Sequence, residues 1–180
     1  MGKVLSIIIV LCALIAGGSM YYLQVYHFYT QVEPNGETDV MLTKVESGAQ
    51  KTLRYQAFKA IDAYSSPIRY RGCFTTDEPL HELRAAYEPY ARALPLVGPR
   101  WFDCFDATEI GEALEQGRAQ AFLGTRDITY GIDRVVAITE DGKGFIWHQI
   151  NRCGEVVFDG DPVPEDCPKP PPQNAQGAQG

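Results

Sequence analysis

The sequence predicts an α+β protein: one N-terminal transmembrane helix, then a small, mainly antiparallel sheet with two helices, braced by disulfides. Three observations lead to this fold class. They are a charge-free stretch near the N-terminus, a hairpin pattern late in the chain, and four cysteines beyond the charge-free stretch. The chain has 180 residues, so the part after the helix has the usual size of one folded domain.

The N-terminal prediction rests on residues 4–23, which read VLSIIIVLCALIAGGSMYYL and contain no charged side chain. As a helix this stretch would be roughly 30 Å long, which matches the hydrocarbon thickness of a bilayer. Tyrosine and phenylalanine residues continue to position 29, and such rings favour the headgroup region. We therefore expect residues 4–29 to form a transmembrane helix with an aromatic interface belt.

The flanking charges predict the orientation of this helix. Lys3 precedes it, and the next basic residue, Lys44, comes long after it. The positive-inside rule then places residues 1–3 in the cytoplasm and the rest in the periplasm, as a single-pass protein of the inner membrane. A cleaved secretory signal is the alternative, because residues 16–18 are small and precede Ser19. The length of the apolar run favours a retained signal anchor.

The pattern after the helix predicts a linker and a first strand. Residues 30–50 are mostly polar and contain the turn signal Pro34-Asn35-Gly36, so we expect a polar linker with one short strand near residues 40–45. Apolar and polar residues alternate from Ile68 to Thr75, which indicates a β-strand.

Two helices are expected next. Apolar residues at helical spacing over 80–90 predict the first, which Pro89 should end or kink. The second should begin at Asp106 as N-cap, with Glu109 as its capping-box partner, and should end at Gly117. We expect both helices to lie on one face of the sheet.

The clearest strand signal is DRVVAITEDGKGFIWHQIN, residues 133–151, in which two β-rich runs flank Asp141-Gly142. That dipeptide is typical of a type I′ hairpin turn. Residues 119–123 and 155–158 could add further strands. The chain is thus expected to divide into a cytoplasmic N-terminus (1–3), the helix and belt (4–29), the polar linker (30–50), a periplasmic α+β domain (51–167) and a disordered Pro-rich tail (168–180).

The charge balance excludes one class of partner. After residue 30 there are 15 Lys or Arg against 23 Asp or Glu, so the exported part carries a net charge of −8. Nucleic acid and anionic lipid surfaces are therefore expected to be poor partners.

Four cysteines lie beyond the helix: Cys73, Cys104, Cys153 and Cys167. An even number in an exported domain predicts disulfides, and we favour Cys73 with Cys104 and Cys153 with Cys167, although a crossed pairing stays open. Each bridge should contribute roughly 3 to 4 kcal/mol. No C-x-x-C motif or close ligand spacing is present, so we assign no metal and no redox centre; a reactive thiol at Cys104 is the minor alternative.

No linear catalytic motif occurs, so we assign no catalytic residue and no cofactor, and an enzyme is the less favoured class. His148 alternates with Ile146 and Ile150, which places it on an apolar strand face, where a hydrogen-bonded core histidine is the commoner outcome. If the domain holds a ligand, we expect the site near His148, with Asp133 and Arg134 across the hairpin.

Three segments carry a resemblance: RWFDCFDATEIGEALEQG, YGIDRVVAITEDGKG and WHQINRCGEVVFDG. Together they resemble an uncharacterised family of short alphaproteobacterial proteins that have one N-terminal membrane helix and a domain of unknown function. The resemblance runs from the anchor to Cys167. It implies the membrane anchor, and it implies no activity, cofactor or site residue.

The favoured hypothesis is therefore a single-pass membrane protein whose periplasmic domain binds or supports another envelope protein. The alternative is a membrane-anchored enzyme or small-ligand binder with its site at Asp133, Arg134 and His148.

Overall fold

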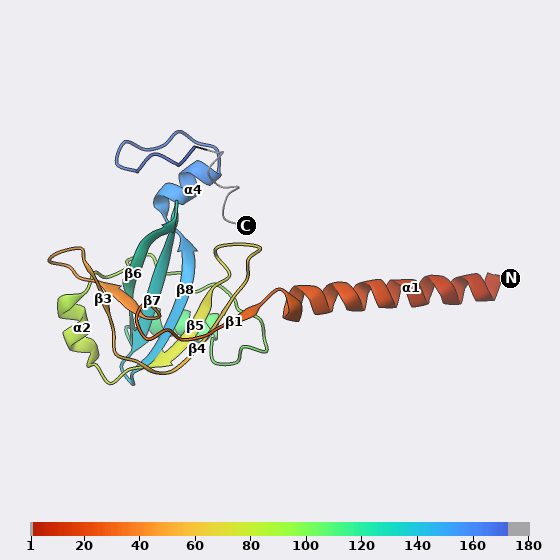
Figure 1. The fold of residues 1–180 in the computed structure, drawn as a ribbon, viewed down its shortest axis with the longest axis horizontal. Helices are drawn as coiled ribbons and strands as arrows, with labels where there is room; N and C mark the ends of the chain where they lie inside the picture. The colour runs from red at the N-terminus through yellow and green to blue at the C-terminus, as the bar shows by residue number, and fades with distance from the viewer. Residues whose placement is uncertain (1, 173–180) are drawn as a thin grey trace.

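The computed structural model describes residues 2–172 and consists of a long helix attached to one α+β domain (Figure 1). Helix α1 (Gly2–Tyr22) continues into a π-helical turn, η1 (Leu23–His27), and projects away from the domain. This helical segment is long and apolar enough to cross a membrane, and its most apolar part is not buried against the domain. The length and composition of this helix therefore fit those of a single-pass membrane protein.

The main sheet of the domain has six strands, and every neighbouring pair is antiparallel. This confirms the predicted fold class. A separate two-stranded ribbon is formed by β2 (Met41–Thr43) and β3 (Gln50–Thr52). In spatial order the six strands are β1 (Thr30–Val32), β4 (Gln56–Asp62), β5 (Arg71–Thr75), β8 (Lys143–Ile150), β7 (Ile132–Thr139) and β6 (Ala119–Thr129).

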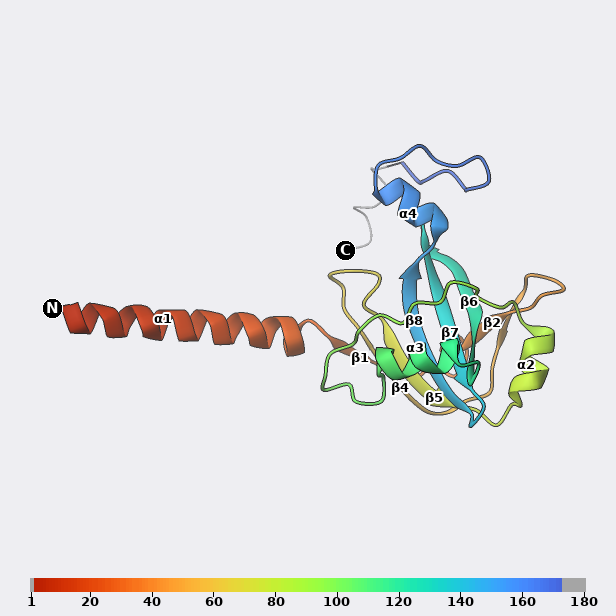
Figure 2. The same cartoon turned by 180° about the vertical axis from the view of Figure 1, so that it is seen from behind.

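The two predicted helices lie on opposite faces of this sheet, so the expectation that they share one face was wrong (Figures 1 and 2). On the first face, α2 (Leu80–Ala86) packs with Val136 of β7. On the second face, α3 (Ala107–Glu115) packs with Val135 of the same strand. Successive residues of a strand point to opposite faces, and here both are fully buried, so each face needs its own cover.

The predicted limits of the second helix are confirmed. The Asp106 side chain accepts hydrogen bonds from the backbone N–H groups of Thr108 (2.8 Å) and Glu109 (3.2 Å), as an N-cap does. Gly117 follows the helix with a φ of +72°, a conformation that glycine adopts without steric cost. The first helix, α2, ends shortly before Pro89, also as expected.

The β7–β8 hairpin forms where predicted, but its turn is not type I′. A type I′ turn needs positive φ at both central residues, and of Asp141 and Gly142 only the glycine has it (+80°). The Gly142 N–H donates to the Thr139 carbonyl at 3.1 Å. The connection is thus a three-residue loop, residues 140–142, with glycine in the left-handed position.

A third helix of the domain replaces the strand expected at residues 155–158. Helix α4 (Arg152–Phe158) begins after Asn151, whose side chain accepts a hydrogen bond from the Gly154 N–H at 3.0 Å. This cap satisfies a backbone donor in the first helical turn, and it outweighs the strand preference of Val156 and Val157.

Residues 30–50, expected as a polar linker, contribute strands β1 and β2 to the domain. Val40 and Leu42 are fully buried in the core on the α2 side. The short strand expected near residues 40–45 is β2. The extended segment around Glu88 lies between β2 and β6. The Glu88 N–H donates to the Thr43 carbonyl of β2, and the Leu123 N–H of β6 donates to the Glu88 carbonyl.

Two disulfides brace the domain with the pairing we favoured. Cys73 on β5 joins Cys104 just before α3, and Cys153 in α4 joins Cys167 near the end of the described chain. The tail expected to be disordered, 168–180, lies largely outside the described residues.

The packing around Gly144 gives a stability prediction. A Cβ at Gly144 would lie 2.1 Å from the buried ring of Phe74, so Gly144→Ala should destabilise the domain by about 1–3 kcal/mol. Gly111→Ala is the matched control: it faces open space within α3 and should stabilise by roughly 0.5–1 kcal/mol. Denaturant unfolding in detergent measures both, and equal free energies of unfolding would contradict this packing.

Candidate functional site

The structure brings together two of the three residues predicted as a ligand site. Arg134 and His148 are opposite each other in the β7–β8 register, and Arg134 Nε lies 3.1 Å from His148 Nε2. Asp133 is the neighbour of Arg134 on the same strand and therefore points to the other face of the sheet. The predicted trio is thus divided by the sheet.

His148 is held in an internal stack. Its ring lies 4.7 Å from the Tyr70 ring and nearly parallel to it, and its Nδ1 is 2.7 Å from the Pro67 carbonyl. Burial, reinforced by the Arg134 charge, lowers the pKa of His148 to about 3, so the ring is neutral and Nδ1–H donates to Pro67. Both ring nitrogens are occupied by protein groups, as in a core histidine.

Asp133 lies on the opposite face of the sheet, where its side chain binds the backbone of Asp127 and two neighbouring side chains. Its side chain is almost fully buried and accepts hydrogen bonds from Tyr90 Oη (3.1 Å), Asn151 Nδ2 (2.8 Å) and the Asp127 N–H (2.9 Å). Burial and the neighbouring Asp133 charge raise the pKa of Tyr90, which keeps this phenol protonated. A polar cavity of about 500 Å³ lies beside the cluster, with Arg126 at its rim.

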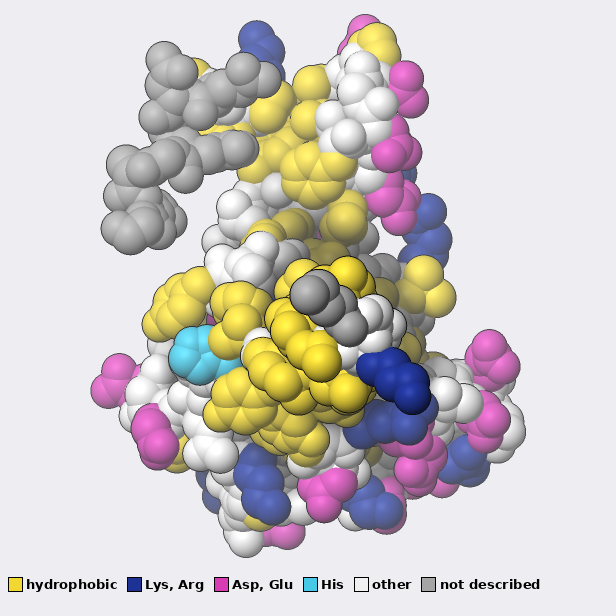
Figure 3. Space-filling model, turned by 90° about the vertical axis from the view of Figure 1, so that its right-hand side faces the viewer, with side chains coloured by type: hydrophobic (Ala, Val, Ile, Leu, Met, Phe, Trp, Pro, Cys, Tyr) yellow, Lys and Arg dark blue, Asp and Glu magenta, His cyan; other side chains and the backbone are white. Residues whose placement is uncertain are grey.

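A hollow lies where the helix meets the domain. In the view along α1 from its N-terminal end, the hydrophobic side chains of the helix itself occupy the centre, and acidic side chains lie mostly toward the edges of the molecule (Figure 3). We call the hollow the exit groove. It has a volume of about 1060 Å³, and residues from three segments line it: 21–29, 65–71 and 96–101.

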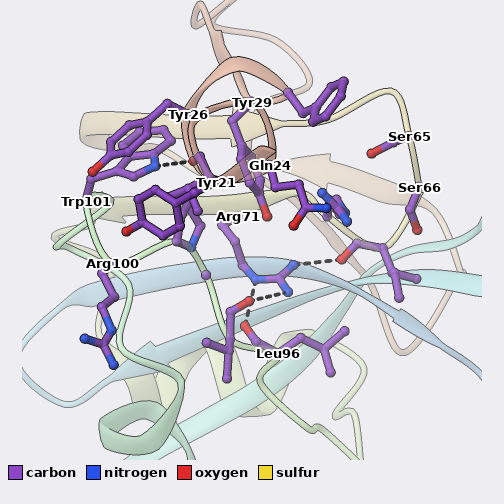
Figure 4. Close-up of a pocket in the computed structure, with 17 residues that line it drawn as sticks. Tyr21, Gln24, Tyr26, Tyr29, Ser65, Ser66, Arg71, Leu96, Arg100 and Trp101 are labelled. Atoms are coloured by element: carbon purple, nitrogen blue, oxygen red, sulfur yellow. Dashed lines mark hydrogen bonds between the residues drawn. The ribbon is translucent and has the colours of Figure 1, made fainter. Parts of the chain in front are cut away.

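One wall of the exit groove is made by Trp101 and the end of the helix (Figure 4). Trp101 Nε1 donates a hydrogen bond of 2.6 Å to the Val25 carbonyl. The Tyr26 ring stacks on Trp101 with ring centroids 6.2 Å apart, and Tyr29 meets its edge at 6.0 Å. These contacts attach the helix exit directly to the loop that precedes α3.

The base of the groove is fixed by Arg71, whose side chain is buried (Figure 4). Its guanidinium donates to the carbonyls of Leu96 (2.7 Å), Val97 (3.2 Å), Ile68 (2.8 Å) and Tyr70 (2.6 Å). Burial lowers the pKa of Arg71 to about 10, which still leaves it charged at neutral pH. Arg71 thus holds the start of the lining segment 96–101 in place and adds a positive charge beneath the groove.

Two further cations, Arg69 and Arg100, line the exit groove. Arg69 lies over the Tyr29 ring at 5.9 Å, and Arg100 is exposed. Within residues 2–172, neither forms a salt bridge, and no described residue that lines the groove is an Asp or Glu. The exit groove is therefore cationic and aromatic, which suits an anion next to an apolar surface.

Sequence reasoning identified the aromatic belt but missed this groove. Its two halves are 76 residues apart in the sequence at the Trp101–Val25 contact, and no local pattern joins them. The tryptophan in front of Cys104 was the one available signal. No cluster of three potential metal ligands occurs among the described residues.

A model for a family of unknown function, DUF6446, matches residues 40–168, so the chain belongs to this family. The resemblance to an uncharacterised family is confirmed to that extent; the matched range does not include the N-terminal helix. No curated protein and no solved structure matches the chain significantly.

The buried histidine predicts a pH dependence of stability. Because the folded-state pKa of His148, about 3, lies below its ordinary value of 6.5, the unfolded chain binds the extra proton first. The contribution is present above pH 6.5 and is lost as the pH falls toward 3, by about 1.4 kcal/mol per unit.

His148→Gln removes this titration. The stability advantage of the wild type over His148→Gln should therefore shrink by about 2 kcal/mol between pH 7 and pH 5, measured by denaturant unfolding. His81→Gln, at an exposed position of α2, is the control and should keep the wild-type profile. A constant difference between wild type and His148→Gln would contradict a neutral buried ring.

Proposed function

We propose that this member of the DUF6446 family is a single-pass inner-membrane protein with a cytoplasmic N-terminus and a periplasmic domain that binds or supports another envelope protein. Two features support the proposal. The apolar helix is preceded by Lys3 and is followed by no basic residue before Lys44. The two disulfides suit an oxidising compartment.

The observation that carries the proposal is the contact between the helix exit and Trp101. Without this contact, the helix could rotate about residues 28–30 relative to the domain. The hydrogen bond from Trp101 to the Val25 carbonyl and the stacking of Trp101 on Tyr26 restrict this rotation. A domain with a restricted orientation presents the same surface to a neighbour in the membrane, which lowers the entropic cost of association.

A catalytic or ligand-binding role at Asp133, Arg134 and His148 has less support. The sheet separates Asp133 from the other two residues, and the polar atoms of His148 are already bonded within the protein. An interaction or support role needs no such constellation.

Topology is tested with single cysteines in a Cys12→Ser background. Ser47→Cys, on the exposed β2–β3 turn, should react with a membrane-impermeant maleimide in intact spheroplasts. Gly2→Cys, the matched position before the helix, should react only after permeabilisation. The intact mass should correspond to the full chain. The reverse labelling pattern, or a mass lacking residues 1–18, would overturn the anchored topology.

The partner role is tested by cross-linking in native membranes followed by quantitative mass spectrometry. The wild type should recover a defined envelope protein, and Trp101→Ala should recover several-fold less of it, because the helix exit is released. Trp101→Phe keeps an aromatic ring against Tyr26 and should retain most of the recovery. If the wild type yields only itself under several mild conditions, the proposed role is wrong.

A further inference from the structure

We propose that the exit groove binds the headgroup of an anionic phospholipid, with Arg69 and Arg100 contacting its phosphate. This inference rests on the proposed function in one respect, namely that α1 crosses the membrane. It adds a ligand class and a site, and it assigns a role to two arginines that form no salt bridge with the described residues.

The groove lies at the level of the lipid headgroups if α1 crosses the membrane. If residues 4–23 cross the hydrocarbon layer, a helix of that length spans roughly 30 Å, and residues 21–29 then lie at the headgroup region. Those same residues form one wall of the groove. A lipid headgroup is thus the ligand that occurs at this level beside any membrane-spanning helix.

The charge of the groove is opposite in sign to that of the whole chain. The whole chain carries a net charge of −7, yet three arginines and no acidic residue are among the described residues that line the groove. Among the described residues outside the groove, the exposed arginines Arg54, Arg126 and Arg152 have a carboxylate partner, whereas the exposed arginines Arg84, Arg92 and Arg118 have none. Arg69 and Arg100 have none within residues 2–172, and a phosphate is the usual bidentate partner of a guanidinium.

Large apolar side chains are exposed at and beside the groove. Tyr64 is 98% exposed and Val97 is 82% exposed, the two highest values among the large hydrophobic residues described. Val97 lines the groove itself, and Tyr64 precedes the lining residues Ser65 and Ser66. Apolar side chains at a bilayer surface enter the boundary between headgroups and acyl chains, so both loops fit a lipid-facing surface.

The overall negative charge does not oppose this assignment. Exposed charges are screened beyond about 8–10 Å at physiological ionic strength, so acidic groups at the edges of the face contribute little at the groove. Arg71, buried beneath the groove, is screened less than a surface charge. Local side chains therefore decide which headgroup is preferred, and they favour an anionic one.

The test uses the full chain in a neutral detergent and native mass spectrometry, with phosphatidylglycerol or phosphatidylcholine added. Wild-type protein should bind phosphatidylglycerol at least about fivefold more tightly than phosphatidylcholine. Because each basic residue near a membrane surface contributes about fivefold, Arg69→Gln with Arg100→Gln should weaken phosphatidylglycerol binding by roughly 25-fold. Arg54→Gln is the matched control, at a 92% exposed side chain away from the groove, and should leave binding unchanged.

Two further measurements, a single variant and a competition with inorganic phosphate, complete the test. Arg100→Gln alone changes an exposed side chain and should weaken binding about fivefold, even if the double variant is unstable. Millimolar inorganic phosphate should not displace the lipid, because it lacks the apolar part that the groove would contact.

Displacement by inorganic phosphate would assign the site to a free anion and overturn the lipid proposal. Equal binding of both lipids, or an unchanged preference in the arginine variants, would also overturn it. Each of these results can be told apart from a failure of the proposed function, because the cysteine-labelling pattern reports the topology independently of lipid preference.

Discussion

The constraint on which the structure depends is that the central strands of the sheet are apolar on both faces. Val135, Val136, Ala137 and Ile138 are consecutive on β7, and all four are fully buried. A sheet of this kind cannot leave one face in water, so two covers are required. The β2–β3 ribbon and α2 provide one, and α3 with the loop before it provides the other.

The second cover also determines where helix α1 attaches. The loop from 96 to 104 is fastened at both ends, by Arg71 through the carbonyls of Leu96 and Val97 and by the disulfide between Cys104 and Cys73. Trp101 lies between these two attachments and contacts the helix exit. The disulfide therefore does more than close a loop: it holds the part of the domain that meets the membrane segment.

Local signals predicted most of the elements, whereas contacts between distant segments could not be predicted. The Asp106 cap and the hairpin around Gly142 depend on a few adjacent residues, and both were found from sequence. The positions of the two helices on opposite faces depend on where each loop crosses the sheet edge, which no local pattern encodes. The exit groove likewise needs Val25 and Trp101 to meet, and only the folded domain brings them together.

The candidate ligand site was partly predictable. The hairpin register placed Arg134 opposite His148, as expected for an antiparallel pair. The separation of Asp133 from them follows from the strand period of two and was available from the sequence, because adjacent residues cannot share a face. By contrast, the burial that makes His148 neutral depends on its stacking against Tyr70, which directly precedes β5 and is far from His148 in the sequence.

Net charge is a poor guide to the membrane contacts of this protein, because the helix removes the step in which net charge matters. A soluble domain with eight net negative charges must first approach an anionic surface against long-range repulsion. If α1 crosses the membrane, the helix exit is held within a screening length of the headgroups, so the side chains at the exit contribute most strongly. There the described groove residues offer Arg69, Arg71 and Arg100 without a carboxylate.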